Sequence, residues 1–78
     1  MKPEIMKYEA DRYALQKIDN RYYASVVCGS SAKYTLNIPI TSEQVNDVMK
    51  DDQLLDELVS EIAFAPKRYL AQHVNFDG

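Results

Sequence analysis

The stretch KYTLNIPI, residues 33–40, decides the fold, because its apolar residues alternate with polar ones and a helix signal follows it directly. Strict alternation predicts a strand with one face in the core, here the face that carries Tyr34, Leu36, Ile38 and Ile40. Pro39 has no N–H to donate, which places it at a strand end or at a sheet edge. Thr41, with Gln44 three residues later, fits a capping box, so a helix is expected to begin at once.

Upstream of this strand, residues 21–28 are rich in aromatic and β-branched residues and predict another strand. Residues 29–32, Gly-Ser-Ser-Ala, predict a hairpin loop between the two strands. Asp19 and Asn20 tolerate the positive φ of a tight turn, so residues 12–18 are expected to form a further strand. A helix is the alternative for residues 5–18, where an apolar stripe also fits helical spacing: Ile5, Met6, Ala10, Tyr13, Ala14 and Ile18.

Downstream, the sequence predicts two helices. The first carries a short apolar stripe after its capping box, and Asp51 or Asp52 is placed to cap the second. Pro66 is expected to stop or kink the second helix near Ala65. The second helix has a wide apolar stripe over about three turns, formed by Leu54, Leu55, Leu58, Val59 and Ile62.

Together these elements predict an α+β fold, an antiparallel β-meander of three to four strands followed by two helices packed on one face. The chain is expected to be one small domain, with a sheet half at residues 1–40, a helical half at 41–74 and a frayed tail at 75–78. The alternative is a leading helix, two strands and two helices.

The composition excludes several classes of function. The 78 residues have a net charge of −3, which argues against general affinity for nucleic acid or for an anionic membrane. No apolar run approaches the ~20 residues that span a bilayer. A single cysteine cannot form an internal disulfide, which fits a reducing compartment, and a small soluble cytoplasmic domain is therefore expected.

The predicted helices concentrate the negative charge of the chain. Between residues 43 and 61 there are seven acids and one base, Lys50. Such a field steers a basic partner into contact, and it is also typical of a solvated helix face. Glu43, Asp47 and Asp51 are spaced to share one helix face. The candidate interaction residues on this acidic helix face are Glu43, Asp47, Asp51, Asp52, Asp56, Glu57 and Glu61.

Tyrosines are the second distinctive feature, with six in the chain. Because neighbouring residues of a strand point to opposite faces, Tyr22 and Tyr23 cannot both lie under the helices. A sheet covered on one face would leave a tyrosine on the open face, where it supplies contact area at little cost in rotamer freedom. The candidate sheet residues for interaction are Tyr22, Tyr23 and Tyr34.

No pattern indicates catalysis or a cofactor. Cys28 ends a predicted strand and His73 is the only histidine. A cysteine nucleophile with a histidine base is the sharpest reading of these two residues, but nothing in their spacing supports it, and a buried thiol is the simpler interpretation. Metal motifs show paired ligands at short spacing, and this sequence contains no such pair, so no metal and no cofactor are expected.

The sequence thus predicts a non-catalytic protein-interaction module that docks on a basic macromolecular partner, and a protein partner is expected. Inhibitors of the antitoxin, immunity or phage counter-defence kind share this size and charge, which is an analogy of scale alone. One alternative is a homo-oligomeric structural or accessory subunit, for instance a homodimer. The other is a small enzyme that uses Cys28 or His73.

Overall fold

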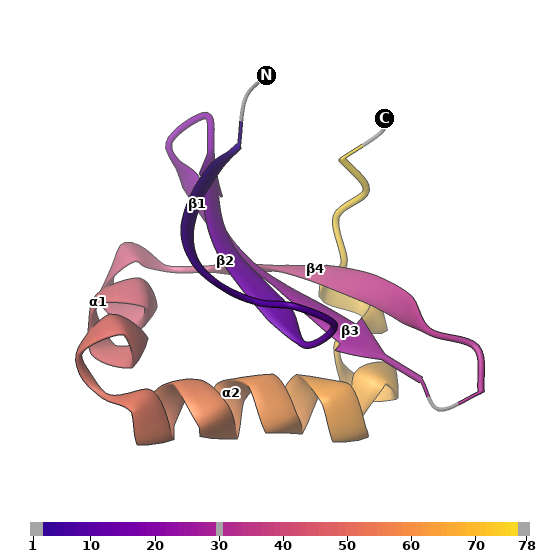
Figure 1. The fold of residues 1–78 in the computed structure, drawn as a ribbon. Coiled ribbons are helices and arrows are strands. Elements are labelled where there is room, and N and C mark those ends of the chain that lie inside the picture. Colours follow the sequence, from indigo (N-terminus) through magenta and orange to yellow (C-terminus); the bar gives the residue numbers. More distant parts are fainter. Residues whose placement is uncertain (1–2, 30, 77–78) are drawn as a thin grey trace.

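The computed structural model describes residues 3–29 and 31–76, and these form a four-stranded antiparallel sheet followed by two helices (Figure 1). The α+β meander predicted from the sequence is confirmed, and residues 5–18 form strands rather than a helix. The strands lie in the order β1-β2-β3-β4. The elements are β1 (Glu4–Glu9), β2 (Tyr13–Ile18), β3 (Arg21–Cys28), β4 (Tyr34–Ile40), α1 (Ser42–Lys50), α2 (Asp52–Phe64) and two 3₁₀ turns, η1 (Pro66–Arg68) and η2 (Leu70–Gln72).

Local turn chemistry sets the register of the central hairpin. Asp19 and Asn20 adopt φ values of 50° and 67°, so both central residues of the β2–β3 turn are left-handed. Such two-residue turns match the right-handed twist of the strands they join. Ile18 therefore pairs with Arg21, and the β2–β3 ladder runs without interruption to Tyr13 opposite Val26.

The capping box begins α1 as predicted. The Gln44 N–H donates to Thr41 Oγ1 at 3.1 Å, and the Thr41 N–H donates to Gln44 Oε1 at 2.9 Å. Asp51 lies between the helices, where its side chain accepts from the Gln53 N–H and caps α2. The expectation that Asp51 continues the acidic face of α1 is therefore wrong, because α1 ends at Lys50 and Asp51 is extended, with φ −133°.

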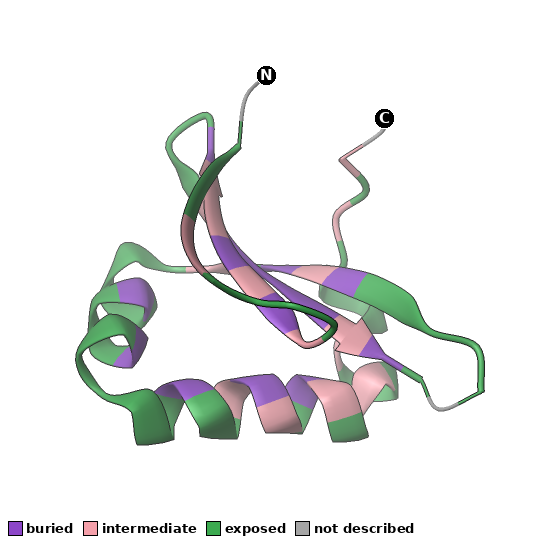
Figure 2. Cartoon of the chain, viewed as in Figure 1, coloured by how far each residue is buried: buried purple, intermediate pink, exposed green. Residues whose placement is uncertain are grey.

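Both helices cover one face of the sheet, and the core lies between these two layers (Figure 2). Val26 at the centre of β3 and Ile62 on α2 are each fully buried. Tyr34 lies on this face with Leu36, as expected, opposite Cys28 of β3. At the start of β4 it nevertheless remains exposed. The core cluster consists of Tyr13, Leu15, Ala24, Val26, Cys28, Leu36, Ile38, Val48, Leu55, Val59 and Ile62.

After α2 the chain turns back towards the sheet. Ala65 ends the helix before Pro66, as predicted, and the two 3₁₀ turns bring the chain to the outer edge of β4. Figure 1 shows the last described residues rising beyond the sheet, away from α2. Residues 75–78 were expected to fray. Phe76 instead contacts the Tyr23 ring, and residues 77–78 lie outside the described part of the chain.

Candidate protein-docking site

A shallow groove separates the outer surfaces of α1 and α2. We call it the acidic groove; it has a volume of about 260 Å³ and is lined by Gln44, Asp47, Val48, Leu54, Glu57, Leu58 and Glu61. Both helices face the sheet with their buried residues, so the groove opens to solvent on the opposite side. The arrangement places carboxylates around an apolar floor.

The floor of the acidic groove is partly exposed. Leu54 keeps 42% of its surface accessible, and Leu58 in the same groove is half-buried. Contiguous exposed apolar surface rimmed by polar residues marks contact sites, and Leu54 and Leu58 line the same groove. Sequence reasoning assigned Leu54 to the core stripe of α2. Its position one residue before the buried Leu55 turns it outward instead.

The seven predicted acidic residues divide into two groups. Within the described part of the chain, Glu43, Asp47 and Glu57 form no ion pair, and Glu61 lies 4.0 Å from Arg68. Asp51 caps α2. The others, Asp52 and Asp56, pair with cations of the sheet half and do not belong to the groove.

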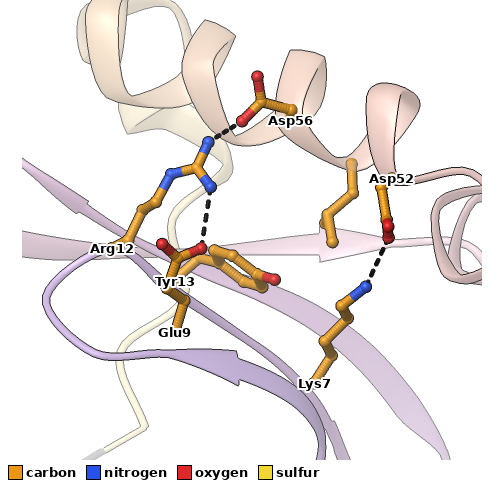
Figure 3. A pocket seen from close by; sticks show the side chains of 7 residues that line it. Lys7, Glu9, Arg12, Tyr13, Asp52 and Asp56 are labelled. Carbon is orange, nitrogen blue, oxygen red and sulfur yellow. Dashed lines mark hydrogen bonds and ion pairs between the residues drawn. The ribbon is translucent and has the colours of Figure 1, made fainter.

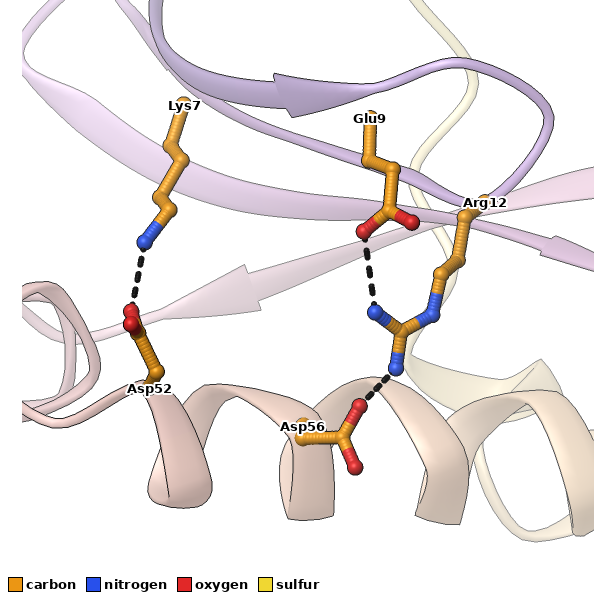
Figure 4. A network of polar contacts seen from close by, with 5 residues as sticks. All are labelled: Lys7, Glu9, Arg12, Asp52 and Asp56. Atoms are coloured by element: carbon orange, nitrogen blue, oxygen red, sulfur yellow. Dashed lines mark hydrogen bonds and ion pairs between the residues drawn. The ribbon is translucent and has the colours of Figure 1, made fainter.

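Ion pairs join the near side of α2 to the sheet (Figure 4). Lys7 on β1 pairs with Asp52 at 2.7 Å. Arg12, in the β1–β2 turn, pairs with Asp56 on α2 and with Glu9 at 2.9 Å. These pairs are exposed, so each contributes little to stability, but together they set where the first two turns of α2 sit against the sheet.

The pairing shifts two pKa values in opposite directions. The hydrogen bond from Lys7, together with its charge, lowers the pKa of Asp52. The same hydrogen bond raises the pKa of Lys7. Both shifts favour the charged pair, so at neutral pH this part of the acidic field is already matched by the chain's own cations.

The side chains of these ion pairs also line a second hollow (Figure 3). It has a volume of about 400 Å³, and Tyr13 and Leu55 line it along with the paired groups. Each of its charged side chains has an opposite charge in contact. The hollow therefore presents no unpaired charge to a ligand, unlike the acidic groove.

The three candidate tyrosines occupy different surroundings. Tyr22 faces the helix side and lies under the Lys17 ammonium, 5.6 Å from the ring centroid. Tyr23 lies on the far face, the face of the sheet opposite the helices, but Phe76 covers it and only 7% of its surface is accessible. Tyr34 is exposed at the start of β4. The structure does not bring the three together into one surface.

Cys28 and His73 are bound to separate parts of the structure. Cys28 is 2% exposed within the core, and burial raises the pKa of its thiol. The carbonyl oxygens of Val26 and Ile62 both lie within hydrogen-bond distance of its single S–H donor, at 3.5 and 3.7 Å from Sγ. His73 Nδ1 accepts the N–H of Asn37 at the edge of β4. A protonated, buried thiol is a poor nucleophile, so this geometry favours the packing role of Cys28.

No protein-family model, no curated protein and no solved structure matches this chain. Among the described helices, none is both long and apolar enough to cross a membrane.

Proposed function

We propose that this chain is a non-catalytic interaction module that docks on a basic protein partner through the acidic groove. The observation that carries the proposal is the position of Leu54, half-exposed among Asp47 and Glu57, whose carboxylates have no ion pair in the described structure. An apolar anchor inside a charged rim is the common arrangement of protein interfaces.

The chemistry of the groove favours one kind of partner. A groove between two helices accepts an amphipathic helix or a short segment with one apolar anchor. Lysine or arginine residues of the partner would then face Asp47, Glu57 and Glu61. If that basic surface of the partner normally binds nucleic acid, the carboxylates of the groove would take the positions of phosphates and block it. The chain would then act as an inhibitor of the antitoxin or immunity kind.

The experiment compares capture of partners by three full-length chains. The first is the natural chain, the second carries Asp47→Asn and Glu57→Gln, and the third carries Glu4→Gln and Asp19→Asn. Both double variants remove two negative charges, and the control sites lie on the sheet half, outside the groove. Asparagine tolerates the positive φ at position 19, so the control turn is preserved.

Quantitative mass spectrometry of proteins captured from lysate at low and high salt gives the readout. We expect a protein that the natural and control chains retain at low salt, and that the groove variant loses. Its association rate with the groove variant should fall, within the roughly 10- to 1000-fold that electrostatic steering provides. Equal recovery of every protein by all three chains contradicts the proposal.

A further inference from the structure

Two residues of the C-terminal segment, residues 73–76, are hydrogen-bonded to Asn37 on the outer edge of β4. The Asn37 carbonyl accepts the Val74 N–H at 2.9 Å, and Asn37 Nδ2 donates to the Val74 carbonyl at 3.0 Å. The Asn37 N–H donates to His73 Nδ1 at 2.9 Å. Asn37 thus binds both backbone groups of Val74, a recognition that does not depend on the side chain at that position.

Asn37 is oriented by a chain of hydrogen bonds across the far face. Gln16 Nε2 donates to Ser25 Oγ at 2.6 Å, and Ser25 Oγ donates to Asn37 Oδ1 at 2.7 Å. Ser25 is 7% exposed, so this chain is largely shielded from water. Because its Oδ1 is engaged from inside, the Asn37 amide keeps its Nδ2 donor pointed outward. The sheet itself therefore positions the receptor for a peptide backbone.

An aromatic contact completes the site. The rings of Tyr23 and Phe76 meet edge to face, with centroids 4.9 Å apart and an angle of 79° between planes. Beside them is a hollow of about 510 Å³, bounded by Ile18 and Arg21 of the β2–β3 hairpin and by Val74. Phe76 follows Val74 by two residues, which is the spacing that puts both side chains on one side of an extended chain.

Pro39 limits pairing at one end of the outer edge of β4. Backbone groups two residues apart in a strand point the same way, so Pro39 faces outward with Asn37 and has no N–H to offer. Val74 and Phe76 are held by hydrogen bonds to Asn37, one of them partly buried, and by a ring contact with Tyr23, and residues 73–76 form no strand ladder with β4. Segments attached in this way open locally at a cost far below that of global unfolding.

We propose that residues 73–76 occupy, within their own chain, a peptide-docking site that an extended segment of another protein can take over. The incoming segment adds to the edge of β4 with its backbone paired to Asn37 and an aromatic residue two positions later against Tyr23, a β-strand addition. The site uses the edge and far face of the sheet. The site is therefore separate from the acidic groove, and the two proposals can be tested independently.

The experiment uses a synthetic peptide with the sequence of residues 70–76, LAQHVNF, as the probe. Its target is the full-length chain with Val74→Pro and Phe76→Ala, in which the receptor residues are intact but their own occupant cannot bind. We expect saturable shifts of the Asn37 backbone amide and of the Tyr23 ring signals. The affinity should be at least tenfold higher than for the natural chain, where the site is occupied.

A matched peptide with proline in place of valine, LAQHPNF, retains the aromatic residue but lacks the N–H that Asn37 accepts. We expect it to bind at least tenfold more weakly. The proposal is overturned if LAQHVNF shifts no signal of Asn37 or Tyr23 in the folded variant, or binds equally with proline. Dimers of the natural chain that exchange their C-terminal segments would also overturn it, since the occupant would then be a second copy.

Hydrogen exchange of the natural chain tests the proposal even if the variant does not fold. Displacement requires local opening, so the Asn37 amide should exchange at least tenfold faster than the Ala24 amide in the centre of the sheet. Equal protection of the two amides means that the segment leaves only on global unfolding, and that result rejects the proposal.

Discussion

At the residue scale, single positions hold the connections of the sheet in conformations that few residue types allow. Asp19 and Asn20 supply the positive φ of the β2–β3 turn, and Asp11 supplies another, with φ 62°, between β1 and β2. Gly29, with φ 91°, starts the connection from β3 to β4. A side chain at that position would be both strained and obstructed, because a Cβ would lie 2.3 Å from the carbonyl oxygen of Ala32.

Gly29→Ala is therefore expected to destabilise the fold. A left-handed non-glycine residue costs about 1–3 kcal/mol, and the clash with a backbone carbonyl adds to it. Urea unfolding at 25 °C measures the loss. Ser31→Ala, an exposed change in the same connection, should stay within about 0.5 kcal/mol of the natural chain. A Gly29→Ala protein as stable as the natural one would contradict the backbone conformation described for this loop.

At the scale of elements, the junctions between layers depend on pairs that are distant in the sequence. Lys7 and Asp52 come from β1 and from the first turn of α2, and Arg12 joins the β1–β2 turn to Asp56. β1 reaches this position through an irregularity between Ile5 and Lys7, where its register against β2 shifts by one residue. The shift places Lys7 opposite Leu15, on the face of the sheet that the helices cover.

Asp52→Asn tests the pair through the pH dependence of stability. Because the pKa of Asp52 is lowered in the folded state, its contribution is present above the ordinary carboxyl pKa of about 4. It is lost as the pH falls through the lowered value. The raised pKa of Lys7 keeps the pair charged until the pH rises through that value at the alkaline end. The stability gap between natural and variant chains should therefore be largest near neutral pH and close in acid.

Glu43→Gln is the matched control for this measurement. Glu43 also lies in the first turn of a helix, but it has no ion pair in the described structure. Its removal reports the interaction of a carboxylate with the helix dipole alone. Chemical denaturation at pH 7 should show a larger loss for Asp52→Asn than for Glu43→Gln. Equal losses would mean that the Lys7 pair adds nothing to stability.

For the molecule as a whole, stability rests on one small core. The Cα radius of gyration is 11.8 Å, close to the ~11.5 Å expected for a compact domain of this length. For 78 residues the free energy of unfolding is expected to be about 4–12 kcal/mol. Ile62 lies where α2 meets the sheet and is fully buried, and its carbonyl oxygen lies within hydrogen-bond distance of Cys28 Sγ.

Ile62→Val is expected to cost about 0.5–1.5 kcal/mol, because it removes one methylene from a fully buried side chain. Leu54→Val serves as the control, because it also removes one methylene, but on the exposed side of the same helix. Leu54 is already half in water, so its change should cost less. Urea unfolding measures both effects, because a lower midpoint at an unchanged m-value reports a loss of stability. A larger loss at Leu54 would contradict the orientation assigned to α2.

The features that sequence predicted correctly depend on neighbouring residues. The Asp19–Asn20 turn, the Thr41–Gln44 box and the stop before Pro66 are each set within a few positions. The features that it missed depend on tertiary placement. Nothing local indicates that Lys7 meets Asp52, 45 residues away, or that Phe76 covers Tyr23 on the far face. The acidic field was visible in the sequence, but its division into paired and unpaired carboxylates was not.

The single-residue junction at Asp51 has a consequence for recognition. Asp51 ends α1 through its own N–H, which donates to the Asp47 carbonyl, and starts α2 through its carboxylate. Only Asp51 separates α1 from α2, so we expect the angle between the two helices to vary little. A protein that docks in the acidic groove, as proposed, therefore binds between helices that are already in position. Binding then does not include the entropic cost of ordering the two helices. Binding of this partner should therefore follow one-step kinetics, without a separate phase for rearrangement of the helices.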